Sequence, residues 1–133
     1  MRYVAFIHKD PDSAYGVSFP DFPGCISAGD TMDEVISMGT EALAFHVRGM
    51  LADGDLIPEP RSLEDIRNDP ALAEDREGAV LTLIPLVRDL GSTTRINVSL
   101  DLGLLEAMDS EARQRKQTRS AFIASAVRKE LTA

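Results

Sequence analysis

The heptapeptide Thr94-Arg95-Ile96-Asn97-Val98-Ser99-Leu100 alternates strictly between polar and apolar side chains. Successive residues of a strand point to opposite faces, so this pattern predicts a strand with one polar and one apolar face. The apolar face carries Ile96, Val98 and Leu100. The opposite face carries Arg95, Asn97 and Ser99.

Two amphipathic helices are expected after this strand. Asp101 can cap the first, and Thr118 can cap the second after the basic stretch 113–117. Apolar residues recur at helical spacing in both segments. They are Leu104, Leu105, Met108 and Ala112 in the first helix, and Phe122, Ile123, Ala126, Val127 and Leu131 in the second.

A strand–helix–helix segment of about 40 residues is too small to fold alone and needs a disulfide, a metal or a second subunit. With one cysteine (Cys25) and two distant histidines (His8 and His46), the sequence lacks the first two. We therefore expect two copies of residues 95–100 to pair as an antiparallel ribbon. Its apolar faces would form a shared dimer core of Ile96, Val98 and Leu100.

The outward face of such a ribbon carries residue types that read DNA. A two-stranded ribbon fits the major groove. Arginine can bond guanine, asparagine can bond adenine, and serine can bond several base edges. We therefore predict base contacts by Arg95, Asn97 and Ser99. The alternative is that these three side chains form only the solvated face of a strand.

A phosphate contact is predicted at the start of the second helix. The N-terminus of a helix offers free N–H groups and the positive end of the helix dipole. Thr118, Arg119 and Ser120 lie there. Thr118 would cap the helix whether or not it also meets a phosphate.

The stretch TRINVSLDLGLLEAMDSEARQRKQTRSAFIASAVRKEL, residues 94–131, resembles the ribbon–helix–helix repressors over nearly its whole length. The start of the second helix, Arg119-Ser120-Ala121-Phe122, is a recurring feature of that family. Lys116 departs from the pattern, because many relatives have a glycine in the turn between the helices. A lysine with positive φ would cost energy there.

The first part of the chain is expected to form a β-sheet. Strands are predicted at residues 2–8, 15–19 and 25–28, and the first two should form a hairpin. The apolar run 79–87 suits a further strand covered on both faces, with Pro85 marking an edge or a bulge.

One long helix is expected between these strands. Thr31 and Glu34 have the spacing of a capping box, and the amphipathic pattern then continues to about Asp53. Gly54 is the expected stop. The acidic, proline-containing stretch that follows is predicted to contain a short helical turn near residues 62–67.

The stretch GVSFPDFPGCISAGDTMDEVISMGTEALAFHVRGMLADGDLIPEP, residues 16–60, resembles the N-terminal domain of HicB antitoxins. The segments FPDFPGC, GDT and LADGDLIPEP carry this resemblance, which with the repressor segment covers essentially the whole chain. It implies an α+β fold. Residues 1–92 would form a partial RNase H-like sheet with one long helix, and residues 93–133 an obligately dimeric ribbon–helix–helix domain.

The same resemblance implies a function. The first domain would bind and block a HicA toxin, a small mRNA-cleaving protein that resembles double-stranded-RNA-binding domains. The second domain would bind operator DNA and repress the antitoxin's own operon. Homodimers or tetramers are expected.

Charge is divided unevenly along the 133 residues. Residues 1–92 hold seven Lys/Arg and 17 Asp/Glu, a net charge of −10, whereas residues 93–133 hold seven and five, a net charge of +2. The acidic part either serves solubility or complements a basic RNA-cleaving toxin. No apolar run is long enough to span a bilayer. The N-terminal apolar stretch is too short for a signal peptide, so we expect a cytoplasmic protein with no membrane partner.

The sequence admits two other function classes. Asp10, Asp12, Asp21 and Asp30 admit a Mg²⁺-dependent nuclease, because such chemistry needs clustered carboxylates. The turn-like contexts of Asp10, Asp12 and Asp21 favour solvated turn residues, so we predict no catalytic residue, no metal site and no cofactor. The other class is a stand-alone ribbon–helix–helix regulator whose first domain senses a ligand or assembles subunits. Two further residues are expected to be structural: Cys25 as a small buried hydrophobe within a strand, and His46 as a packing residue.

Overall fold

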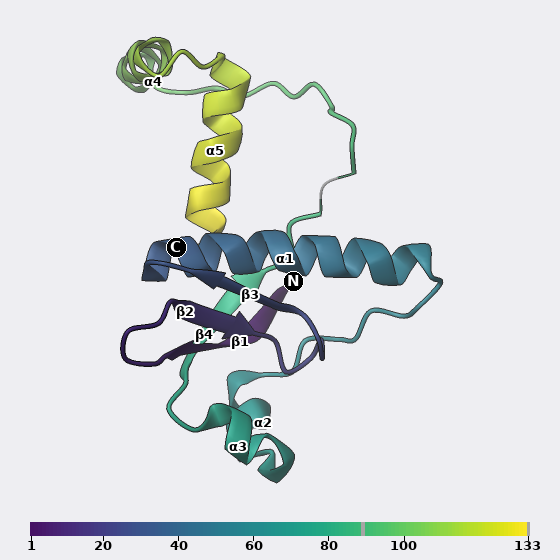
Figure 1. The fold of residues 1–133 in the computed structure, drawn as a ribbon. Helices are drawn as coiled ribbons and strands as arrows, with labels where there is room; N and C mark the ends of the chain where they lie inside the picture. Colours follow the sequence, from purple (N-terminus) through teal and green to yellow (C-terminus); the bar gives the residue numbers. More distant parts are fainter. Residues whose placement is uncertain (89, 133) are drawn as a thin grey trace. The chain divides into compact units, whose positions relative to one another are not determined.

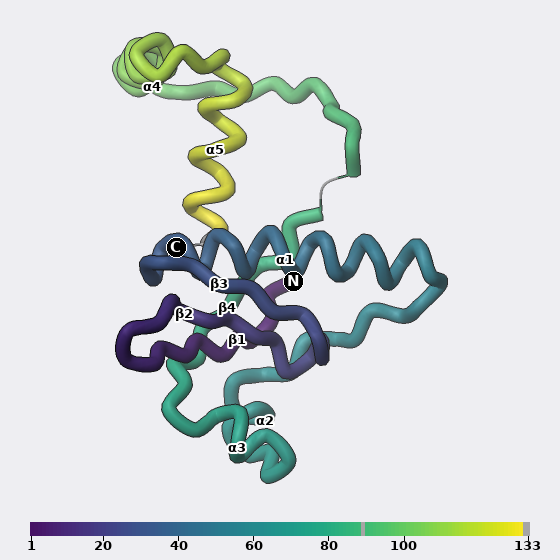
Figure 2. The backbone as a smooth tube through the Cα atoms, in the orientation of Figure 1, coloured from purple at the N-terminus to yellow at the C-terminus, as the bar shows by residue number. Residues whose placement is uncertain are grey.

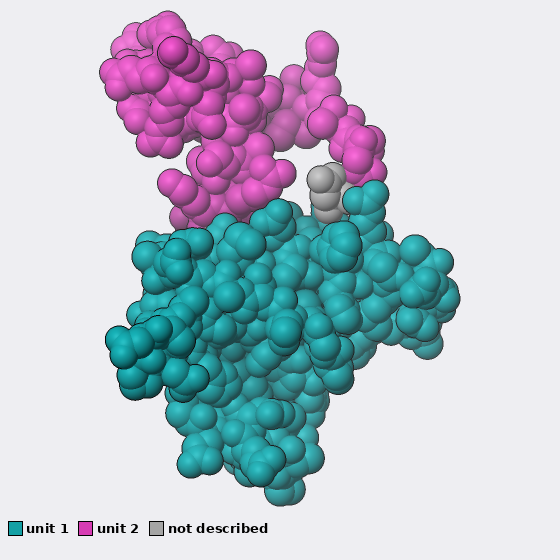
Figure 3. Space-filling model, viewed as in Figure 1, with its two compact units in different colours: residues 1–89 teal, residues 90–133 magenta. Residues whose placement is uncertain are grey.

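The computed structural model describes residues 1–88 and 90–132, and the chain forms two compact units, residues 1–89 and 90–133 (Figure 3). The first unit contains a four-stranded antiparallel sheet in the order β3-β2-β1-β4. Its strands are β1 (Arg2–Lys9), β2 (Tyr15–Ser18), β3 (Ile26–Gly29) and β4 (Val80–Pro85). The architecture is α+β, as expected.

A tight turn joins β1 to β2 in the predicted hairpin. The Ser13 N–H donates to the Asp10 carbonyl at 3.2 Å, and Asp12 has a φ of 60°. Asp tolerates this left-handed conformation better than most residues, because its short side chain can bond locally. The register places Phe6 opposite Ser18 and His8 opposite Gly16.

The long helix α1 (Met32–Ala52) covers one face of the sheet (Figure 1). Its first turn shows half of the expected capping box, because the Glu34 N–H donates to Thr31 Oγ1 at 3.0 Å. It ends in a Schellman motif around Gly54, whose φ is 79°: Asp55 N–H donates to Met50 O and Gly54 N–H to Leu51 O. The predicted start and stop are therefore confirmed.

The main core lies between α1 and this face of the sheet. It contains Tyr3, Ala5 and Ile7 of β1, Val17 of β2 and Ile84 of β4, packed against Val35, Leu43 and Val47 of α1. The helix approaches the sheet closely. A Cβ on Gly29 would lie 2.6 Å from the backbone nitrogen of Val35, so only glycine fits there.

Three short helices cover part of the opposite face. They are α2 (Leu63–Asn68), the 3₁₀ helix η1 (Pro70–Leu72) and α3 (Ala73–Arg76), reached by the chain path that Figure 2 traces from the end of α1. Ile66 packs there on Val4 and Phe6 in a second, smaller core. The helical turn expected near residues 62–67 is confirmed, and Ser62 and Asp65 form its full capping box.

Two strand expectations are wrong in detail. β4 is an edge strand that pairs only with β1, as Pro85 indicated. It is covered only in part, because Val80 is 55% exposed, whereas Ile84 is buried in the main core and Leu81 packs in the second core. A continuous apolar run does not show how completely a strand is covered, because packing is decided at long range. Cys25 precedes β3 and is not part of it.

The second unit contains α4 (Leu102–Gln114) and α5 (Arg119–Thr132), which contact each other. Asp101 Oδ2 accepts the N–H groups of Gly103 and Leu104, so the predicted cap is confirmed. Residues 94–100 form no strand in this single chain. A strand is stabilised by pairing, and within one chain this segment has no strand of the described residues beside it.

Candidate functional site

The face of the sheet opposite α1 is only half covered. The short helices pack over β1, whereas the polar or small residues of β2 and β3 on that face remain accessible. The strand register aligns Phe6, Ser18 and Ile26 in one row and His8, Gly16 and Ala28 in the next. Ile26 is 71% exposed, which is unusual for a large apolar residue in a sheet.

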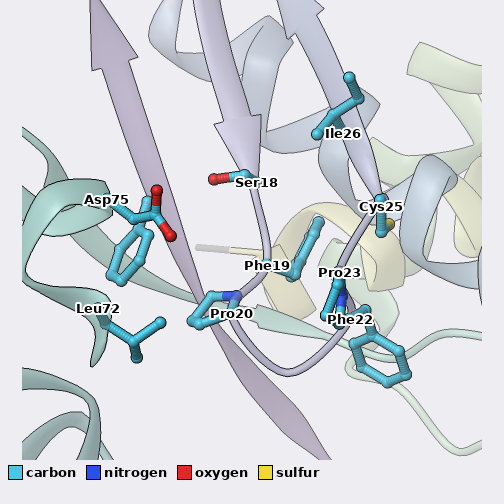
Figure 4. Close-up of a pocket in the computed structure, with 11 residues that line it drawn as sticks. Ser18, Phe19, Pro20, Phe22, Pro23, Cys25, Ile26, Leu72 and Asp75 are labelled. Atoms are coloured by element: carbon cyan, nitrogen blue, oxygen red, sulfur yellow. The ribbon is translucent and has the colours of Figure 1, made fainter. Parts of the chain in front are cut away.

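A pocket of about 330 Å³ lies at the border between the covered and the open half. Its lining is mostly aromatic, aliphatic and prolyl: Phe6 and Ile26 come from the sheet, Pro20 and Pro23 from the loop after β2, and Leu72 from η1. Figure 4 shows the Ser18 hydroxyl and the Asp75 carboxylate pointing toward each other in this pocket. The pocket therefore combines an apolar lining with two hydrogen-bond acceptors.

An ion-pair network fixes the loop that forms one wall of the pocket. Arg61 Nε donates to Asp21 Oδ1 at 2.7 Å, Arg61 N–H donates to Asp21 Oδ2 at 3.1 Å, and Arg61 Nη1 donates to Asp69 Oδ2 at 3.0 Å. The Asp21 side chain is only 4% exposed. The hydrogen bond to Asp21 raises the pKa of Arg61, so the guanidinium stays charged. Asp21, one of the carboxylates considered for a metal, is thus used to hold the loop.

Phe22 anchors the same loop from the other side. Its ring packs edge-on against Tyr3 at 4.7 Å and against His46 at 5.9 Å between centroids. His46 is therefore a packing residue, as predicted. Cys25 is buried, as predicted, and burial raises the pKa of its thiol to about 11, which disfavours the reactive thiolate.

The remaining acidic candidates do not assemble into a site. Asp10 and Asp12 belong to the hairpin turn, and Asp30 precedes the cap of α1. Among residues 1–88 and 90–132, no three His, Cys, Asp or Glu side chains are grouped so that they could hold a metal ion. None of the helices in these same ranges is long and apolar enough to cross a membrane.

In the second unit, the segment predicted to read DNA is open on both sides. Arg95, Asn97 and Ser99 are exposed. The predicted dimer core is exposed as well: the exposed fraction is 71% for Ile96, 61% for Val98 and 42% for Leu100. Neighbouring apolar residues of the helices share this exposure: Leu102, Leu104, Val127 and Leu131.

The residues predicted to meet a phosphate begin α5. Thr118 Oγ1 accepts the Ala121 N–H at 3.1 Å, so Thr118 caps the helix. Arg119 forms a bidentate ion pair with Asp109 of α4, which sequence analysis missed. This hydrogen-bonded pair lowers the pKa of Asp109 and raises that of Arg119. Helical spacing could not reveal it, because ten residues and a turn separate the two side chains.

The turn between α4 and α5 contains a strained residue. Lys116 has a φ of 54°, and a Schellman motif surrounds it: Gln117 N–H donates to Ala112 O and Lys116 N–H to Arg113 O. The turn thus keeps the left-handed geometry that a glycine would adopt there, although this chain has a lysine.

These features define a class of protein. The chain combines an α+β unit, which carries a pocket on a half-open sheet, with a second unit whose helix pair follows an exposed, alternating segment. Residues 3–127 match the family described as HicB-like antitoxins of bacterial toxin–antitoxin systems, and the chain belongs to this family. Antitoxins of this kind have a non-enzymatic role.

Individual relatives agree with this assignment. The Burkholderia pseudomallei antitoxin HicB, known from a crystal structure, is 33% identical, with a TM-score of 0.56 and coverage of 98% of both chains. A chain of the HicA3 and HicB3 toxin–antitoxin complex is 31% identical, with a TM-score of 0.53 over 64% of this chain and 96% of that one. An uncharacterised 14.9 kDa protein of Haemophilus phage HP1 is 35% identical over 111 residues, 82% of this chain and 80% of its own.

Proposed function

We propose that this chain neutralises a HicA-type toxin through its first unit and represses its own operon through a dimeric second unit. The family match over residues 3–127 carries this proposal. The solved complex of a HicA3 toxin with a HicB3 antitoxin supports it, since a chain of that complex is similar to this one. On this proposal residues 1–92 form the partial RNase H-like, toxin-binding domain.

The charge of the first domain supports the same partner. Its net charge of −10 suits a small basic protein that normally binds RNA phosphates. Carboxylates on an inhibitor can occupy the place of those phosphates, and electrostatic attraction speeds capture. A toxin that cleaves mRNA and an operator are both cytoplasmic targets, so we place the protein in the cytoplasm.

The exposure of Ile96, Val98 and Leu100 supports a dimeric ribbon–helix–helix domain in residues 93–133. Two copies would bury these side chains against each other and against the helices, which leaves Arg95, Asn97 and Ser99 on the outside to contact bases. The first turn of α5, with Thr118, Arg119 and Ser120, would then contact a phosphate. A homodimer or tetramer on operator DNA is the resulting assembly.

Purification of the tagged full chain from its native operon tests the proposal directly. We expect a small basic protein to co-purify, and we expect its growth arrest to be relieved when the chain is co-expressed. Transcription from the operon's own promoter should fall in the presence of the chain. A chain that represses its promoter but captures no toxin would instead be a stand-alone regulator. Metal-dependent cleavage of nucleic acid by the purified chain would indicate a nuclease.

A further inference from the structure

The half-open sheet face of the first unit has the features of a docking surface. The floor next to the pocket consists of the small residues Gly16, Ser18 and Ala28, so another chain can approach the strands closely. Ile26 stands at the edge of this floor and is 71% exposed. A preformed pocket with a mostly apolar lining and a few polar groups is typical of a binding site, and Ile26 extends its apolar lining to the rim.

The charges around the pocket select the kind of partner. Leu72 and Asp75, which line the pocket, belong to residues 62–78, a segment with six Asp/Glu and two Arg. Arg76 Nη1 donates hydrogen bonds to the backbone carbonyl oxygens of Ile66 and Asp69. Within the ranges that the structure describes, the exposed Asp75 carboxylate forms no ion pair. The Asp75 side of the pocket therefore favours a positively charged group on the ligand.

The apolar lining of the pocket further restricts the chemistry of the group that can bind there. A long basic side chain has an apolar stem and a charged end. The stem fits between Phe6, Pro20 and Leu72, while the charged end can donate to the Ser18 hydroxyl and the Asp75 carboxylate, which point toward each other (Figure 4). The hydrogen bonds of Arg61 to Asp21 hold the loop after β2 in place before a ligand binds. Binding therefore costs little conformational entropy in this loop.

We propose that this pocket, with Ile26 at its rim, is the docking site for the toxin, and that it receives an arginine or lysine side chain of the toxin. This inference rests on the proposed function. It adds the surface that binds the toxin and the chemistry of the group that enters it.

Two matched pairs of variants in the full chain test the assignment. Asp75→Lys and Glu41→Lys change the net charge equally, but Glu41 lies on α1, which packs on the other face of the sheet. Ile26→Lys and Phe45→Lys both replace exposed apolar residues, and Phe45, on α1, is 78% exposed. All four sites are exposed, and circular dichroism checks that each variant remains folded.

The probe is the toxin that co-purifies with the chain from its native operon, in an inactivated variant, and binding is measured by calorimetry. We expect Asp75→Lys and Ile26→Lys to weaken binding at least tenfold, as substitutions at interface hot spots do, and the α1 variants to change it less than about threefold. The reverse pattern would place the toxin on α1 and overturn the inference.

Other outcomes are equally decisive. Toxin binding by the parent chain with no effect of either pocket variant leaves the proposed function intact and overturns the pocket assignment. Pocket variants that alter self-association in sedimentation, but not toxin affinity, would assign the surface to a second copy of this chain and overturn it too. A parent chain that binds no toxin overturns the proposed function itself.

Discussion

Arg119 of α5 and Asp109 of α4 form a bidentate ion pair. Arg119 Nε lies 3.0 Å from Asp109 Oδ1, and Arg119 Nη2 lies 2.8 Å from Asp109 Oδ2. The pair orients the guanidinium at the start of α5, where we propose a DNA phosphate binds, but it also places a carboxylate beside that phosphate. On that proposal Asp109 would oppose DNA binding electrostatically, while it holds Arg119 in position.

Asp109→Asn should strengthen binding to random DNA. The substitution removes one negative charge beside the proposed phosphate contact, and the expected gain is about threefold at low salt. The gain should fade as salt screens the interaction. Filter binding at two salt concentrations measures it. Weaker binding at both would mean that Asp109 acts mainly by positioning Arg119.

Asn97→Ala and Arg119→Ala should separate base reading from phosphate contact. Loss of a base contact should cost about 1–3 kcal/mol on the true operator and almost nothing on random DNA. Loss of Arg119 should weaken binding to the operator and to random DNA equally. It should also reduce the slope of log affinity against log salt concentration by about one unit. Gel-shift titrations at several salt concentrations distinguish the two. Equal losses on both DNAs for Asn97→Ala would show that Asn97 does not read bases.

Val98→Asp should break the proposed dimer. An unpaired carboxylate in the shared ribbon core costs several kcal/mol. The adjacent Ser99→Asp introduces the same charge on the outward face, so it should impair DNA binding and leave the dimer intact. Sedimentation of the full chains compares them. An unchanged dimer for Val98→Asp would place the dimer contact in the first unit.

Lys116→Gly should stabilise the second unit. Lys116 has a φ of 54°, which glycine adopts without strain, and the expected gain is about 0.5–1 kcal/mol after the larger chain entropy of glycine is counted. Gly54 at the end of α1 has a φ of 79° in the same motif, so Gly54→Ala should cost about 1 kcal/mol. Thermal denaturation of both variants measures these opposite effects. Two changes of the same sign would rule out backbone strain as their cause.

Ionisation of Cys25 should destabilise the fold at high pH. Burial raises its pKa from 9.0 to about 11, so the folded state holds the thiol proton more tightly than the unfolded state. The resulting stabilisation is fully present below pH 9 and is lost as the pH rises toward 11. The loss amounts to about 2–3 kcal/mol, at 1.36 kcal/mol for each pKa unit. Urea unfolding at pH 8 and pH 11 should show a larger decrease for the parent than for Cys25→Ala, which lacks the thiol. Equal decreases would show that the thiol does not ionise in this range.

Local chemistry made several elements of this protein predictable from the sequence. Thr31 and Gly54 delimit α1, and Asp101 and Thr118 cap α4 and α5, because each of these residues bonds or bends the backbone within a few positions of itself. The alternation at residues 94–100 predicts a strand in the same way. Residues 94–100 form no strand in one chain, however, because a strand needs a pairing partner and the described residues of the same chain supply none.

Only the tertiary structure decided which distant residues meet. Arg61 reaches Asp21 across 40 positions, and Asp75 faces Ser18 across the pocket, although nothing in their local sequence links them. The apolar run at 80–85 became an edge strand because β1 already pairs with β2 on its other side. The sequence by itself thus determined where the long helices begin and end, since those limits depend on short-range hydrogen bonds. The pocket and its ion pairs depend on long-range packing, which sets how the strands order and which half of the sheet stays open.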